Sequence, residues 1–140
     1  MSIVDIYLAY AAAFEETFVD DDWSRLERFF AEDVVYRAGN GTEASGRDAV
    51  LAAMRDSVNA FDRQLDLREM ADVAPVQEGS QVSVNWTATY RLSGVPDLVM
   101  SGTETATFDG DVIALLSDVF DEGVAERAAE WFEAHGDRFS

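Results

Sequence analysis

The chain has 140 residues, enough for one domain with a substantial hydrophobic core. It carries 28 acidic and 10 basic residues, for a net charge of −18, and every basic residue is an arginine. Such a surface repels phosphate backbones, so we expect no nucleic-acid partner. Cysteine is absent and histidine occurs once. The sequence therefore predicts neither a disulfide nor a metal site.

Location and charge lead to two further expectations. No apolar run approaches the roughly 20 residues that a membrane span requires, and the N-terminal segment lacks the features of a signal peptide. We expect a cytoplasmic protein with no membrane partner. The acidity and the missing lysines have two explanations that the sequence leaves open. One is halophilic adaptation, in which salt screens self-repulsion, and the other is GC-rich coding.

The first half of the chain predicts three helices and one short strand. Helical spacing of apolar residues covers 3–18, a short second helix covers 23–30, and a strand covers 34–37. Ser45 and Asp48 resemble a capping box that opens the third helix. The inward stripes of these helices are Ile3, Tyr7, Ala11, Phe14 and Phe18, then Trp23, Leu26, Phe29 and Phe30, then Val50, Met54, Val58 and Phe61.

The second half predicts strands followed by a last helix. The strand segments cover 64–73, 81–92, 98–108 and 112–120, and a helix follows residue 123. The Asp-Gly pair at 109–110 is a hairpin signal between the last two strands. Helices followed by long antiparallel strands predict an α+β fold, with residues 1–140 as one domain.

Three segments carry a resemblance to a known superfamily. They are Phe-Ala-Glu-Asp-Val-Val-Tyr at 30–36, Ser-Gly-Arg-Asp-Ala-Val at 45–50, and Ser-Asp-Val-Phe-Asp at 117–121. In this order they resemble the nuclear-transport-factor-2-like superfamily, which includes SnoaL-like polyketide cyclases, ketosteroid isomerases, limonene epoxide hydrolases and many non-enzymes. The resemblance implies a single cone-shaped domain of helices and a curved antiparallel sheet around a small-molecule pocket.

The epoxide hydrolases are similar through the second segment, and their pocket tyrosine and one catalytic aspartate correspond to Tyr36 and Asp118. Their catalytic arginine and second aspartate, however, correspond to Trp86 and Ala88. Against ketosteroid isomerases, the oxyanion tyrosine corresponds to Phe14, the base to Ala38 and the neutral aspartate to a position near Glu104. Neither complete set is present, and a shared fold does not by itself transfer an activity.

Strand alternation indicates Glu104 as a pocket carboxylate without reference to the family, whereas the side on which Asp118 lies rests partly on the resemblance. Along 98–108, Glu104 shares its face with apolar residues and glycine, which is an informative exception. On the last strand, Asp118 shares a face with Leu116 and Phe120. The functional interpretation makes Glu104, Asp118 and Tyr36 catalytic. The structural alternative pairs Glu104 with Arg91 or Arg37.

Six further residues are candidates for substrate contact, although each could equally be core: Phe14, Phe18, Met54, Trp86, Tyr90 and Met100. The preferred hypothesis is a cofactor-free acid/base enzyme of isomerase, hydrolase or cyclase type that acts on a small apolar substrate. Desolvation would keep Glu104 neutral, hydration would keep Asp118 ionised, and Gly102 would leave room for a ligand. The alternative is a non-catalytic binding or accessory domain.

The opposite face of the sheet lacks charge, which is unusual in so acidic a chain. Uncharged residues of this kind suit a two-fold contact, so the sequence predicts a homodimer through the outer sheet face. The predicted face comprises Ser83, Asn85, Thr87, Thr89, Ser101, Thr103, Thr105, Thr107, Ile113, Leu115, Ser117 and Val119.

Overall fold

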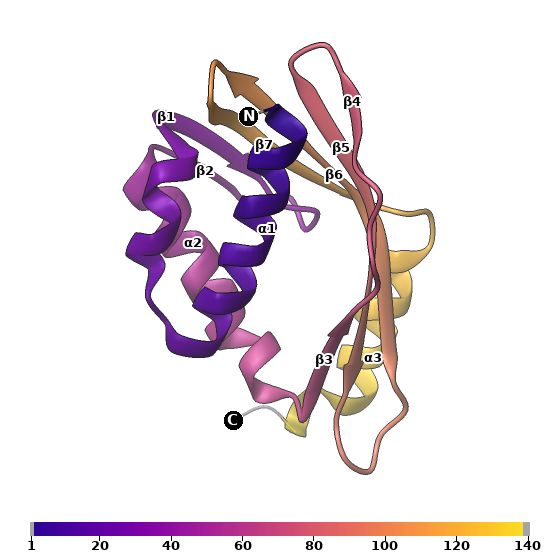
Figure 1. The fold of residues 1–140 in the computed structure, drawn as a ribbon. Coiled ribbons are helices and arrows are strands. Elements are labelled where there is room, and N and C mark those ends of the chain that lie inside the picture. The colour runs from indigo at the N-terminus through magenta and orange to yellow at the C-terminus, as the bar shows by residue number, and fades with distance from the viewer. Residues whose placement is uncertain (1, 139–140) are drawn as a thin grey trace.

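The computed structural model describes residues 2–138, and Figure 1 shows helices covering one face of a curved sheet. The first helix, α1 (Ile3–Asp20), begins with reciprocal hydrogen bonds. Ser2 Oγ accepts the Asp5 N–H at 3.2 Å, and the Asp5 carboxylate accepts the Ser2 N–H at 3.3 Å. The helix ends at Asp21, which adopts the left-handed conformation (φ 63°) that aspartate tolerates better than most residues.

The second predicted helix is the 3₁₀ helix η1 (Trp23–Phe29), and β1 (Phe30–Arg37) follows at once. A short strand, β2 (Glu43–Ser45), then pairs with β1 before α2 (Arg47–Ala60). The predicted capping box at Ser45 is wrong, because Ser45 belongs to β2. Gly46 precedes α2 with φ 92°, and no side chain caps the helix.

The remaining strands are β3 (Leu67–Met70), β4 (Val76–Glu78), β5 (Gln81–Arg91), β6 (Leu98–Asp109) and β7 (Val112–Phe120). Together with β1 and β2 they form a seven-stranded sheet in the order β2-β1-β7-β6-β5-β3, with β4 also paired to β5. The α+β cone fold is confirmed. One detail differs from the prediction, because β1 and β7 run parallel and the sheet is therefore mixed.

A β-bulge in β7 shifts the alternation of side chains. Phe108 pairs with Ile113 but Thr107 pairs with Leu115, so Ala114 is the extra residue. Ile113 is therefore fully buried on the inner face, and its predicted place on the outer face is wrong. Beyond the bulge, Leu116 and Asp118 return to the inner face as predicted, opposite Ala106 and Glu104.

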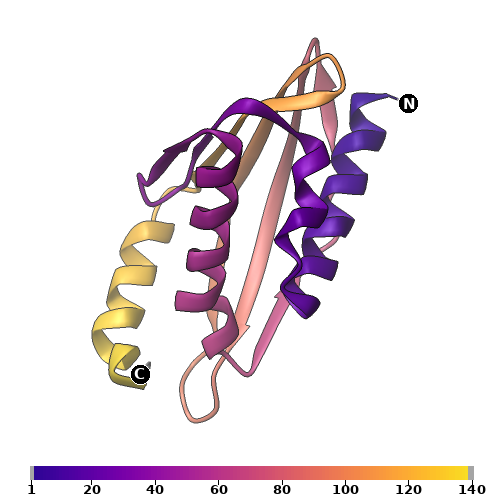
Figure 2. The same ribbon diagram turned by 90° about the vertical axis from the view of Figure 1, so that its left-hand side faces the viewer.

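The helices lie over the inner face of the sheet, and α2 lies between α1 and the last helix, α3 (Val124–His135), in Figure 2. The main core joins α1, η1, α2 and the sheet, whereas a smaller cluster surrounds Trp131 of α3. The indole N–H of Trp131 donates to the Pro96 carbonyl at 2.9 Å and so ties α3 to the β5–β6 connection. None of the helices within residues 2–138 is long and apolar enough to cross a membrane.

Candidate functional site

A cavity of about 790 Å³ lies between the inner face of the sheet and the helices. Its walls come from α1, α2, α3 and strands β1, β3, β5, β6 and β7, and they are mostly apolar and aromatic. Both the size and the character fit pockets that enclose small organic molecules. Residues 45–49 of the segment that carries part of the family resemblance lie elsewhere. They border a separate hollow at the start of α2.

The cavity brings together eight of the nine residues singled out from the sequence. These are Phe14, Tyr36, Met54, Trp86, Tyr90, Met100, Glu104 and Asp118. The exception is Phe18, which does not line the cavity, so its predicted role in substrate contact needs correction. It lies near the end of α1, with the guanidinium groups of Arg63 and Arg68 at 5.7 and 5.0 Å from its ring centre.

Glu104 and Asp118 are direct cross-strand neighbours on β6 and β7. Inward-facing residues of an antiparallel pair have Cβ atoms roughly 5 Å apart, so the two carboxyl groups share one site. No arginine within residues 2–138 forms an ion pair with either carboxyl group. Arg91 pairs with Glu69 and Asp97, and Arg37 pairs with Glu43. The predicted pairing of Glu104 with Arg91 or Arg37 is therefore wrong.

Tyr7 completes the site, although the sequence analysis placed it only on a helix stripe. Its hydroxyl donates to Glu104 Oε1 at 2.6 Å, a bond between residues 97 positions apart in the chain. The ring is 4% exposed, so this hydrogen bond is largely shielded from bulk solvent. Tyr7 lies two helical turns before Phe14, the position that the isomerase resemblance indicated, on the same face of α1.

Burial dominates the protonation of this group. Desolvation raises the pKa of Glu104, and hydrogen bonds from Tyr7 and Asp118 oppose the rise. Desolvation, followed by the charge of Glu104 and the hydrogen bond to it, raises the pKa of Asp118 to about 9. Both pKa values are raised, so the pair retains a proton at neutral pH.

Tryptophan occupies the space that the sequence analysis assigned to a ligand above Gly102. Trp86 pairs across the strands with Gly102, and a Cβ atom on Gly102 would lie 3.0 Å from the Trp86 ring and 2.4 Å from the Val119 carbonyl oxygen. The indole N–H of Trp86 lowers the pKa of Asp118. It is nonetheless buried without a hydrogen-bond partner among residues 2–138.

A second polar cluster lines the same cavity near β3. Arg68 Nε donates to Asp62 Oδ2 at 2.8 Å, and Arg68 Nη1 donates to Glu15 at 2.7 and 3.0 Å. The Arg68 side chain is 11% exposed and the Asp62 side chain 14%. Burial raises the pKa of Asp62, and the charge of Arg68 opposes the rise. Tyr90 is the cross-strand neighbour of Arg68 and lines the cavity beside it.

Comparison with known protein families agrees with this fold and its pocket. A family model described as the SnoaL-like domain matches residues 10–118, most of the chain. The chain belongs to the SnoaL-like family. No curated protein matches this SnoaL-like chain at a significant level.

Solved structures share the fold of this SnoaL-like domain at low identity. TerC, co-crystallised with polyporic acid, is 17% identical with a TM-score of 0.70, and the match covers 94% of this chain and 98% of TerC. A candidate polyketide cyclase from Pseudomonas putida is 19% identical with a TM-score of 0.68 and the same coverages. A ketosteroid-isomerase-like protein from Catenulispora acidiphila, in complex with trimethylamine, is 16% identical with a TM-score of 0.63, covering 87% and 95%. At these identities the likeness shows the fold alone.

Proposed function

We propose that this SnoaL-like domain is a cofactor-free enzyme that moves a proton on a small, largely apolar substrate bearing a carbonyl group. The observation that carries the proposal is the Glu104–Asp118 pair, buried at the cavity wall without an arginine among the described residues and bonded to Tyr7. A carboxyl pair that shares one proton offers an acid and a base side by side.

The pair can perform one balanced step. Ionised Glu104 takes a proton from the carbon next to the substrate carbonyl, so that the C–H bond breaks and its electrons form an enolate. Asp118 donates its proton, or a hydrogen bond, to the carbonyl oxygen as charge develops there. The neutral N–H of Trp86 is a second donor for that oxygen. Preorganised donors in a dry site stabilise such an oxyanion more than water does.

The enolate then takes the proton back from Glu104 at another carbon, or its carbon attacks a second carbonyl of the same molecule. The first outcome is isomerisation and the second is cyclisation. The resemblance in fold to a candidate polyketide cyclase supports the cyclase type, and the mostly apolar cavity supports a polycyclic or polyketide-like substrate. Epoxide hydrolysis is less well supported, because Trp86 and Ala88 occupy the positions of the hydrolases' arginine and second aspartate.

Exchange of deuterium into bound ketones tests this proposal without knowledge of the final product. A panel of bicyclic and tricyclic ketones is first screened by thermal shift. Exchange at the carbon next to the carbonyl is then followed by NMR in heavy water. We expect Glu104→Gln to reduce exchange by about 10²-fold or more while binding persists, because a general base contributes on that order.

Glu122→Gln, an exposed change of the same chemistry after β7, is the matched control and should exchange like the wild type. Binding without exchange in the wild type would refute the catalytic proposal. It would favour the alternative of a non-catalytic binding or accessory domain, for which the missing arginine and aspartate at positions 86 and 88 are the supporting observation.

We also infer that a second copy of the chain pairs through the outer face of β5, β6 and β7. Val99 and Val119 are 46% and 64% exposed there. Ser83 and Thr105 bond to each other at 3.1 Å, as Asn85 and Thr103 do at 2.9 Å, which leaves a flat uncharged surface. Light scattering in high salt should report a dimer, and Thr105→Glu should give a monomer. A wild-type monomer at micromolar concentration, or a Thr105→Glu dimer, would contradict this.

A further inference from the structure

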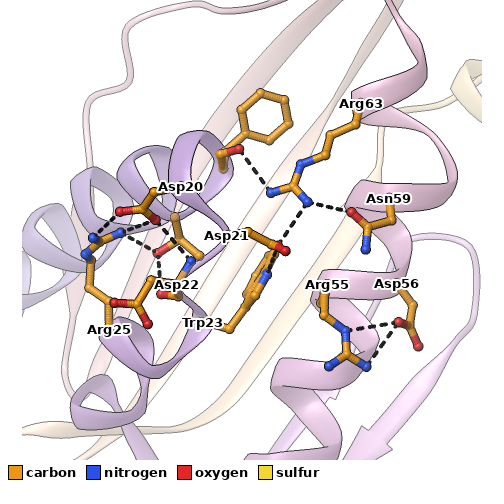
Figure 3. Close-up of polar contacts among 11 residues, drawn as sticks. Asp20, Asp21, Asp22, Trp23, Arg25, Arg55, Asp56, Asn59 and Arg63 are labelled. Atoms are coloured by element: carbon orange, nitrogen blue, oxygen red, sulfur yellow. Dashed lines mark hydrogen bonds and ion pairs between the residues drawn. The ribbon is translucent and has the colours of Figure 1, made fainter.

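The cavity carries an excess of acidic groups. Four carboxyl groups line it, whereas Arg68 is the one basic side chain on its walls within residues 2–138. Its guanidinium is held by bonds to Glu15, Asp62 and Tyr90, so its charge is offset where it lies. Three more arginines pair with aspartates outside the cavity (Figure 3), namely Arg25, Arg55 and Arg63. The described residues therefore leave the carboxyl pair without a cation.

Aromatic rings border the carboxyl pair on the inner face of the sheet. Glu104 and Asp118 form one cross-strand row, and the next row along the strands places Trp86 and Phe120 on either side of Gly102. Successive inner-face residues of a strand are roughly 7 Å apart. The ring centres of Trp86 and Phe120 are 6.1 Å apart, with the ring planes at 73°. The two carboxyl groups and the two rings are half-buried, and all four line the cavity.

This combination of groups favours a positively charged ligand. A cation within about 6 Å of an aromatic ring is attracted by the negative face of the ring, and tryptophan is the strongest partner. An opposite charge within roughly 4–6 Å also favours the ionised state of a carboxyl group. A fully methylated ammonium has no N–H group that needs a hydrogen bond, so it suits the mostly apolar walls better than a primary amine.

We propose that the carboxyl end of the cavity binds the quaternary ammonium group of a largely apolar organic cation, and that this binding releases a proton from the pair. The ammonium lies between the carboxyl groups and the rings of Trp86 and Phe120, and the apolar part extends along the cavity. One carboxyl O–H bond breaks, its electrons stay on the carboxylate, and the proton passes to the buffer. This binding does not depend on the proposed proton transfer, since no bond to carbon breaks.

Proton release gives the affinity a defined dependence on pH. Burial and the neighbouring carboxylate raise the pKa of Asp118 to about 9. Because coupling is reciprocal, a cation that lowers this pKa by about 1–3 units binds about 10- to 1,000-fold more tightly after the proton has left. The other titratable groups facing the pair are the hydroxyls of Tyr7 and Tyr10 on α1 and Tyr36 on β1, and burial raises their pKa values further, so they stay neutral. Strand β5 presents the neutral indole of Trp86, and the described parts of α2 and α3 present only uncharged residues.

Benzyltrimethylammonium is a suitable probe, because its charge does not depend on pH. Neopentylbenzene, its neutral isostere, is the matched ligand. NMR titration at fixed ionic strength should show that wild-type protein binds the cation about tenfold more tightly than the isostere at pH 9. From pH 9 to pH 6 the affinity for the cation alone should fall by about tenfold or more. Calorimetry in two buffers of different ionisation enthalpy should detect the released proton at pH 7.5.

The double variant Glu104→Gln/Asp118→Asn should bind the two ligands equally at every pH. Asp111→Asn/Glu122→Gln removes two exposed carboxyl groups and is the matched control, which should keep the wild-type preference. If the cavity double variant fails to fold, Asp118→Asn carries the test, since it should abolish the rise in cation affinity between pH 8 and pH 9.

Four results would overturn the inference: equal affinity of the wild type for both ligands, binding of neither, cation binding without proton release, or loss of the preference in the exposed double variant. Each leaves the proton-transfer proposal to its own test, because deuterium exchange is measured without any cation.

Discussion

Replacing Asp118 by asparagine should stabilise the protein at neutral pH while it removes the proposed acid. In the folded state the pKa of Asp118 is raised to about 9 by burial and by the charge of Glu104. An acid whose pKa is raised by folding has no effect on the free energy of unfolding below its unfolded pKa. As pH rises from the unfolded pKa to the folded pKa, the unfolded state releases its proton and the folded state keeps it, so the free energy of unfolding falls. Asparagine cannot ionise, so Asp118→Asn escapes this loss.

The size of the effect follows from the two pKa values. At pH 7 the unfolded carboxyl, with its ordinary pKa of 3.8, has released its proton whereas the folded one has not. From pH 3.8 to pH 7 the buried carboxyl therefore lowers the free energy of unfolding by about 4 kcal/mol, and from pH 3.8 to pH 5 by about 1.6 kcal/mol. Relaxation around the buried pair reduces such values, so we expect about 2–4 kcal/mol at pH 7. For a chain of this size, that raises Tm by about 8 °C or more.

Thermal and urea unfolding of both proteins from pH 5 to pH 9, at one fixed salt concentration, measures the difference. The advantage of Asp118→Asn should grow steadily across this range and level off near pH 9. Asp111→Asn makes the same replacement at an exposed position on the β6–β7 turn and should show no such growth. A difference independent of pH, or a less stable Asp118→Asn at every pH, would refute the reasoning about the buried pair.

Two further predictions concern stability. If the net charge of −18 reflects halophilic adaptation, Tm should rise substantially from low to molar salt, and a flat or falling curve would favour GC-rich coding. Gly102→Ala should cost about 2 kcal/mol or more in urea unfolding, because its Cβ would lie 2.4 Å from the Val119 carbonyl oxygen. Gly136→Ala, where a Cβ meets nothing within 4 Å, should be close to neutral and is the control.

Alternation and helical spacing were sufficient to predict much of the fold and the inner face of the sheet. β6 keeps strict alternation from Leu98 to Thr107, so placing Glu104 among apolar residues required only a period of two. The prediction for Ile113 failed because a bulge changes that period, and nothing in the local sequence marks it. The strands β2 and β4 were missed because each has only three residues, too few for any periodicity.

The contacts that give the site its chemistry could not be predicted in the same way. The bond from Tyr7 to Glu104 depends on where α1 crosses the sheet, which is set by packing over the whole core. The same holds for the contact of Arg68 with Glu15, which joins β3 to α1. A partial signal was present for Tyr7, since it shares the inward helix face with Phe14 and is the residue on that stripe with a polar tip.

We expect the residue at position 86 to influence the protonation of the carboxyl pair. This chain has tryptophan there, where the resemblance to epoxide hydrolases implies an arginine. An arginine at this position would favour ionised carboxylates, whereas the neutral indole of Trp86 leaves the proton on the pair.

We therefore expect Trp86→Arg to lower the pKa of Asp118 by about 1–3 units, as a neighbouring guanidinium generally does. In the Trp86→Arg background the advantage of Asp118→Asn should level off between about pH 6 and pH 8 instead of near pH 9, and the advantage at pH 9 should shrink. Trp86→Phe, which removes the N–H but keeps a neutral aromatic ring, is the control and should leave the advantage in place. An unchanged advantage in the arginine background would mean that Trp86 does not control the protonation of the pair, and that the distinction from the hydrolases must lie elsewhere in the cavity.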